Sequence, residues 1–263
     1  MKKLVLALTA VAAFSGSALA ADLPARTYTK APVIVETPSW TGFYIFGGAG
    51  GGIWDADSNA FNNVTGTPLT TSQRQGGDGW FGTVGAGYDW QFNHSWVFGI
   101  LADGQFGSLR GSLPGVLPGG AVVTGTEKLR DTWAAGARLG YLVAPNVLSY
   151  VNAGYTQGYW SSTTLGPLGG VGALATTPSW NKGGWFVGGG VENNLNIFGI
   201  SAPGWFMKTE YRAAYFGTKN LQESDGTTGL PTNVTTTFKP FVETISTSLV
   251  YRFNWTGPVV AKY

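Results

Sequence analysis

Residues 204–216, GWFMKTEYRAAYF, alternate apolar and charged side chains along the chain. Lys208, Glu210 and Arg212 occupy one parity, and Trp205, Met207, Tyr211, Ala213 and Tyr215 occupy the other. Because successive side chains of a β-strand point to opposite faces, the segment predicts a strand with one charged and one apolar face. Trp205 and Tyr215 lie ten residues apart. Ten residues of a strand tilted by about 40° cover roughly 25 Å, the height of the apolar band of a transmembrane barrel.

Three other segments repeat this aromatic spacing. Trp80 and Trp90, Trp96 and Phe106, and Phe241 and Tyr251 are also ten residues apart, each pair on one parity. Together with Trp205 and Tyr215, these eight residues are the predicted aromatic girdles at the two membrane surfaces. We therefore expect the apolar faces to point at lipid and the charged faces to point at the barrel axis.

Eight segments share this period-two pattern, and the gaps between them alternate in length. The predicted strands are 41–54, 79–92, 95–108, 129–142, 147–160, 183–193, 204–216 and 239–253. Long gaps rich in Gly, Thr and Asn at 55–78, 109–128, 161–182 and 217–238 are predicted extracellular loops, and they include Glu127 and Glu223. The gaps at 93–94 and 143–146 are tight, and the one at 194–203 is intermediate. This pattern predicts an all-β fold, an eight-stranded antiparallel up-and-down transmembrane β-barrel.

The charged faces predict an ionic network in the lumen. Its members are Asp103, Arg138, Glu192, Lys208, Glu210, Arg212 and Arg252. An eight-stranded barrel is just wide enough for side chains to fill it, and buried charges need partners. We expect a polar plug; a narrow or gated solute path lined by these groups is the alternative. For the first and fifth predicted strands, the pattern does not decide which face points inward. Tyr44 and Trp54 share one face of the first strand, and Tyr150 and Trp160 share one face of the fifth, but the opposite faces are equally apolar.

The ends of the chain predict export. Residues 1–20 combine Lys2 and Lys3, a short apolar stretch and the sequence ALA at 18–20, as in a cleaved secretory signal peptide. Residues 21–39 contain three prolines and are expected to form a periplasmic linker, residues 40–253 the barrel, and residues 254–263 a periplasmic tail. Without the signal, the chain has 14 basic and 14 acidic residues, so its charge does not indicate a nucleic-acid partner. It has no Cys, which excludes disulfides and Cys-ligated metal sites.

Six short segments resemble one family in their order along the chain. They are ADLP at 21–24, WTGFY at 40–44, GAGYDWQ at 85–91, GGVE at 189–192, EYR at 210–212 and YRFNW at 251–255. They resemble the small porin-like outer-membrane protein family of alphaproteobacteria, within the superfamily of OmpA-like eight-stranded barrels. The resemblance implies an outer-membrane location, with lipid and lipopolysaccharide as neighbours. Tyr251 and Phe253 resemble the signal read by the barrel-assembly machinery, although ten residues follow Phe253 here.

The sequence contains no pattern that favours catalysis. The Gly-rich run at 47–52 lacks the Gly-Lys-Ser/Thr of a phosphate loop and is expected to serve strand packing. His94 is the single histidine and falls in a predicted periplasmic turn. We therefore expect no enzyme, no cofactor and no metal site.

Four kinds of function remain compatible with the sequence. We expect an envelope-structural or surface-contact protein with a filled lumen. The alternatives are a small porin for hydrophilic solutes, or a surface receptor or adhesin that binds an unidentified ligand, such as haem, through its loops. A soluble ligand-binding barrel is a further alternative, which solubility without detergent would distinguish.

Overall fold

The computed structural model describes residues 39–116, 122–168, 170–197 and 200–253. The predictions for the signal peptide, the tail and all but the last residue of the linker lie outside these ranges. The described strands are β1 (Gly42–Asn62), β2 (Gln73–Phe92), β3 (Trp96–Val116), β4 (Val122–Ala144), β5 (Val147–Trp160), β6 (Thr163–Pro167), β7 (Ala175–Thr177), β8 (Trp180–Ile197), β9 (Ile200–Phe216), β10 (Lys219–Asp225) and β11 (Pro231–Arg252).

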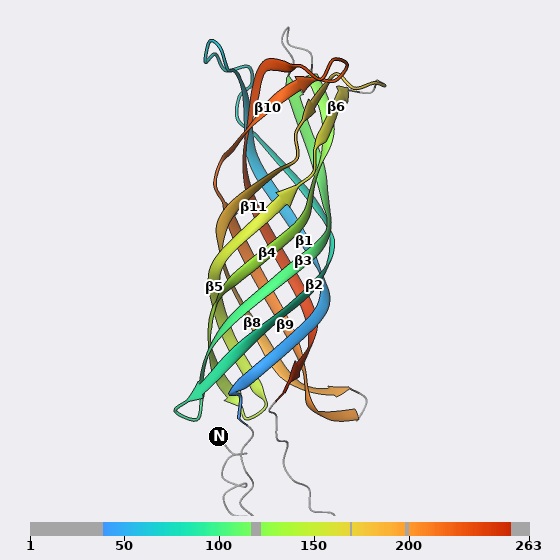
Figure 1. Cartoon of the computed structure of the whole chain (residues 1–263). Helices are drawn as coiled ribbons and strands as arrows, with labels where there is room; N and C mark the ends of the chain where they lie inside the picture. The colour runs from blue at the N-terminus through green and yellow to red at the C-terminus, as the bar shows by residue number, and fades with distance from the viewer. Residues whose placement is uncertain (1–38, 117–121, 169, 198–199, 254–263) are drawn as a thin grey trace, which may run out of the picture. The chain divides into compact units, whose positions relative to one another are not determined.

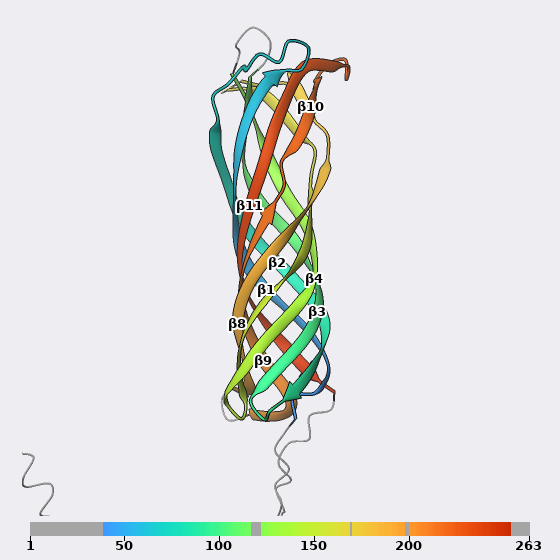
Figure 2. The ribbon, with the colours of Figure 1, turned by 90° about the vertical axis from the view of Figure 1, so that its left-hand side faces the viewer.

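Eight of these strands close into a ring. The order is β1-β2-β3-β4-β5-β8-β9-β11, and β11 pairs back with β1 along a register that runs from Tyr44–Arg252 to Asn62–Val234. Every pairing is antiparallel, and each strand of the ring lies next to its neighbours in the chain (Figures 1 and 2). The predicted fold class, an eight-stranded antiparallel up-and-down barrel, is confirmed.

At one end of the barrel, the wall continues far beyond the ends of the predicted strands. Three strands are interrupted at 161–162, 178–179 and 217–218, and β6, β7 and β10 then continue β5, β8 and β9. There the order is β4-β6-β7-β10-β11, and Figure 1 labels β6 and β10 at the same end of the barrel. We name β6, β7, β10 and the adjoining parts of β1–β4 and β11 the β-extension.

The prediction that the four long gaps are loops was therefore wrong for most of their length. Their β-branched Thr and Val residues have high β-propensity, and each gap folds back on itself as a hairpin. Turns are confined to the tips of the hairpins. Gly66 and Gly229 lie at such tips with φ of 73° and 71°, a backbone conformation that glycine adopts easily because it has no Cβ. Glu127 and Glu223, predicted in loops, consequently lie on β4 and β10 and are buried.

The opposite end has tight turns. Asn93 and His94, in the three-residue turn 93–95 between β2 and β3, both have positive φ, 48° and 60°. Short turns face the periplasm in outer-membrane barrels, so the β-extension lies on the extracellular side.

The inward faces of β1 and β5 are now defined. Tyr44, Trp54, Tyr150 and Trp160 are buried, whereas Phe43, Ile45, Ile53, Val151 and Tyr155 are exposed on the outer wall. Both faces are equally apolar, so alternation could not choose between them; the buried aromatic rings pack against arginines and other rings of the interior.

Candidate functional site: the filled barrel interior

The interior near the periplasmic end holds four charges of balanced sign. Arg138 Nε lies 2.9 Å from Asp89 Oδ1, and Arg138 Nη1 lies 3.1 Å from Glu192 Oε2. Arg252 Nη2 lies 2.9 Å from Asp89 Oδ2 and 2.8 Å from Glu192 Oε1. Each arginine thus contacts both carboxylates, and all four side chains are almost inaccessible to solvent. We name these residues the lower quartet.

A second balanced group lies beside it and forms the upper quartet. Arg212 donates from Nη1 and Nη2 to the two carboxylate oxygens of Asp103, at 2.9 and 2.8 Å, and from Nη2 to Glu210 at 2.7 Å. Lys208 Nζ lies 3.7 Å from Glu210 Oε2. The Tyr150 hydroxyl donates to that same oxygen at 2.8 Å. The bidentate Arg212–Asp103 pair fixes the position of both strands that carry it.

The structure places all seven predicted network residues in the interior and adds Asp89, which the sequence reading missed. Two signals could have identified it. Asp89 has the parity opposite to Tyr88 and Trp90, and the seven predicted charges comprised four bases but only three acids. Because a buried charge needs a partner, that imbalance required one further acid.

Aromatic rings flank the charges. Arg138 lies over the ring of Tyr44 at 4.4 Å, and Arg212 lies over Phe186 at 4.4 Å. Lys208 Nζ lies 3.3 Å from the ring centroid of Phe46. Arg252 lies 4.3 Å from that of Trp40, which packs against Phe206 in the periplasmic hydrophobic cluster. Cation–π contacts are stronger when desolvated, so these rings support the buried cations and close the lower lumen.

A chain of five buried rings lies inside the barrel on the extracellular side of the quartets. It runs Trp54–Phe238–Trp180–Trp160–Phe216, with centroid separations of 5.6, 5.2, 4.1 and 5.3 Å. Trp160 and Trp180 are stacked face to face at an interplanar angle of 2°. The five rings come from β1, β11, β8, β5 and β9, and all five are buried in one hydrophobic cluster to which β2, β3, β4 and β10 also contribute. We name this chain the aromatic plug.

Two buried carboxyl groups lie inside the β-extension, on the extracellular side of the plug and outside the membrane-spanning segments. Glu127 contacts the Thr163 hydroxyl at 2.6 Å and accepts a hydrogen bond from Trp180 Nε1 at 3.3 Å. Glu223 Oε1 accepts one from the Thr236 hydroxyl at 2.7 Å. Burial raises the pKa of Glu127 to about 7, and burial also raises the pKa of Glu223.

The hydrogen bonds of Thr163 agree with a protonated Glu127. Thr163 Oγ1 is 3.1 Å from the carbonyl oxygen of Thr126 and 2.6 Å from Glu127 Oε2. A hydroxyl has one hydrogen to donate but can also accept. If Thr163 donates to the carbonyl and protonated Glu127 donates to Thr163, both contacts are satisfied.

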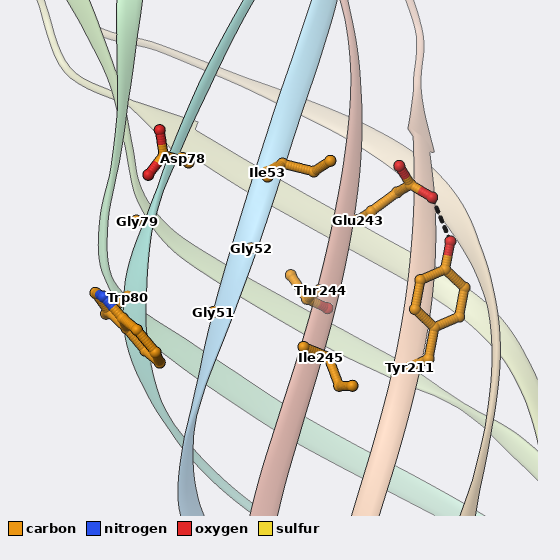
Figure 3. A pocket seen from close by; sticks show the side chains of 10 residues that line it. All are labelled: Gly51, Gly52, Ile53, Asp78, Gly79, Trp80, Tyr211, Glu243, Thr244 and Ile245. Carbon is orange, nitrogen blue, oxygen red and sulfur yellow. Dashed lines mark hydrogen bonds between the residues drawn. The ribbon is translucent and has the colours of Figure 1, made fainter.

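The predicted girdle residues lie on the outer wall. Trp80, Trp90, Trp96, Phe106, Trp205 and Tyr215 are exposed, with Trp80 at 79%, and Phe241 and Tyr251 are partly exposed. Tyr251 and Phe253, the predicted assembly signal, pack edge to face at 5.1 Å at the end of β11. A groove of about 500 Å³ also opens on this wall across β2, β1, β11 and β9, where Tyr211 donates a hydrogen bond to Glu243 (Figure 3).

The described residues contain no group of three or more His, Asp or Glu side chains placed to hold a metal ion. His94 lies in the β2–β3 turn and is exposed. No helix in the described part of the chain is long and apolar enough to cross a membrane.

Comparison with known proteins gives close relatives. The chain is 33% identical over 233 residues to the 31 kDa outer-membrane immunogenic proteins of Brucella melitensis biotype 1 and Brucella suis biovar 1, covering 86% of this chain and 91% of each relative. The outer-membrane protein OprG of Pseudomonas aeruginosa matches in structure with a TM-score of 0.50 at 10% identity, over 81% of this chain and 97% of that protein. No protein-family model matches. The OprG likeness concerns the fold alone.

Proposed function

Because this chain belongs to the family of the Brucella 31 kDa outer-membrane immunogenic protein, and is an outer-membrane β-barrel, we propose that it is a non-conducting structural barrel that holds its β-extension and loop tips outside the cell. The observation that carries the proposal is the filled interior. The aromatic plug, the two quartets and the periplasmic cluster around Trp40 follow one another along the axis. We propose no catalytic role. Export through a signal at residues 1–20 and recognition of Tyr251 and Phe253 by the assembly machinery stay predictions.

Conductance tests this proposal. Refolded protein in a planar bilayer is expected to give no steady ohmic steps, because ions would have to displace stacked Trp160 and Trp180 and then pass two paired quartets. A 16-stranded porin in the same bilayer serves as the positive control. Steady steps that scale with the amount of protein would refute the non-conducting barrel and favour the alternative, a small porin.

A second candidate function is contact through the loop tips. Leu168, Val171 and Leu230 are exposed by 74%, 97% and 66%. Gly226 N donates to Leu174 O at 2.9 Å, so the β6–β7 and β10–β11 hairpins adjoin. The Brucella relative is named as immunogenic, and we propose that this apolar tip is the corresponding exposed surface here.

Small changes at the tip test surface contact better than loop deletions. Removing 161–179 and 218–237 would delete β6, β7 and β10 from the wall. The triple variant Leu168→Ser, Val171→Ser, Leu230→Ser keeps the strands. We expect antibodies raised against the folded protein to bind intact cells that carry this variant at least about threefold less. Undiminished binding, with the same shift between unboiled and boiled gel mobility as wild type, would exclude the tip as the main contact surface.

A further inference from the structure

In the described ranges, the basic side chains of this barrel fall into two locations. Of the eleven Lys and Arg residues in the described ranges, Arg138, Lys208, Arg212 and Arg252 belong to the quartets. The other seven all lie on the extracellular side of the outer-wall aromatic residues of their strands: Arg74, Arg110, Lys128, Arg130, Lys182, Lys219 and Lys239. Such a distribution matches a layer of anionic headgroups above the apolar band.

A groove of about 660 Å³ opens among these cations on the outer wall. Its lining includes Arg74, Lys239, Gly217 and the carboxylates Asp55 and Asp57. Lys182 lies next to the groove. Its Nζ is 3.5 Å from the position that a Cβ would occupy on Gly217, which lines the groove. Arg74 pairs with Asp55. Lys182 and Lys239 therefore leave the groove with one positive charge in excess of its acids.

The interruption of one strand creates this groove. Pairing of β11 with β9 ends at Phe241–Tyr215, and pairing of β11 with β10 begins at Phe238–Lys219. Pro240 occupies the break, where a residue without a backbone N–H costs no ladder hydrogen bond. Gly217, between β9 and β10, leaves room for the Lys182 side chain.

Three aromatic rings form the membrane side of the groove. Trp185 stacks on Tyr215 at 4.3 Å, and Tyr215 contacts Phe241 at 4.6 Å. All three line the groove. Trp and Tyr rings favour the level where acyl chains meet headgroups, and their faces also pack against sugar rings.

We propose that this groove binds the phosphorylated sugar headgroup of an outer-leaflet glycolipid, with Lys182 and Lys239 on phosphate and the Trp185–Tyr215–Phe241 rings under the sugar. The volume suits more than a single phosphate, and the position at the top of the apolar band suits a ligand whose acyl chains continue down the wall. The lipid lies outside the barrel, so the proposal does not depend on whether the lumen conducts.

Binding of purified lipid A to the refolded full-length barrel in detergent tests the proposal. The assay contains EDTA, which removes divalent bridges to Asp57. We expect bisphosphorylated lipid A to bind at least about tenfold more tightly than its dephosphorylated form, since charge-assisted contacts to phosphate are strong. Phosphatidylglycerol is expected to bind more weakly than lipid A, and inorganic phosphate is expected not to compete.

Matched charge changes locate the site. Lys182→Gln with Lys239→Gln is expected to lower lipid A affinity about tenfold, whereas Arg110→Gln with Lys128→Gln, at the same level on β3 and β4, is expected to change it less than about twofold. Gel mobility of unboiled samples shows that each variant is folded. Equal losses in the two pairs, equal binding of dephosphorylated lipid or phosphatidylglycerol, or competition by inorganic phosphate would each overturn the proposal.

Discussion

Arg138→Met is expected to lower the free energy of unfolding of the refolded barrel by about 3–5 kcal/mol, the usual cost of leaving a buried charge without its partner. Arg138 contacts both Asp89 and Glu192, and its guanidinium lies over the rings of Tyr44 and Tyr150 at 4.4 and 5.1 Å. Methionine retains most of the side-chain volume but leaves Arg252 alone to balance two buried carboxylates. Urea unfolding, followed by gel mobility of unboiled samples, measures the difference.

Two further variants separate charge from packing. Arg110→Met removes an exposed arginine of the outer wall, so its free energy of unfolding should remain within about 0.5 kcal/mol of wild type. The double variant Arg138→Met, Asp89→Leu removes one charge of each sign and should recover more than half of the loss. If the double variant is as unstable as the sum of its parts, pairing in the lower quartet is not what stabilises the barrel.

The membrane-spanning part of the fold was predictable because one physical rule acts on every residue there. Lipid on one side and a narrow lumen on the other force strict alternation, so Lys208, Glu210 and Arg212 revealed both the strand and its inward face. Asp89 was also readable, but only by balancing charges across strands. The faces of β1 and β5 were not, because Tyr44 and Phe43 are equally apolar and differ only in what they contact.

The β-extension escaped sequence reading for a different reason. Outside the membrane both faces of a strand can be polar, so segments such as 219–225 and 231–238 lose the contrast between faces. Turn-forming Gly and Asn residues near the tips then make the whole gap resemble a loop. Burial of Glu127 and Glu223 depends on the pairings β4–β6 and β7–β10, which join segments that are distant in the chain.

Because Glu127 and Glu223 are buried, we expect the protein to lose stability as pH rises through the weakly acidic range. An accessible glutamate in the unfolded chain ionises near pH 4.5, whereas the pKa of Glu127 in the folded protein is about 7. Below pH 4.5 the carboxyl is protonated in both states and its titration has no effect. Between 4.5 and 7 only the unfolded state releases its proton, so the free energy of unfolding falls by up to about 1.4 kcal/mol per pH unit. Glu223 acts in the same direction.

Glu127→Gln isolates this effect, because glutamine is neutral and its amide can still donate to Thr163. We expect the variant to match wild type within about 1 kcal/mol at pH 4.5 and to be more stable by about 3 kcal/mol at pH 8. Urea midpoints at pH 4.5, 6 and 8 measure the divergence, and Asp57→Asn on the exposed face of β1 should follow the wild-type curve. Parallel curves for wild type and Glu127→Gln would contradict this prediction. They would mean that Glu127 ionises near its ordinary pKa, and therefore that water or a cation reaches it beside Thr163 and Trp180.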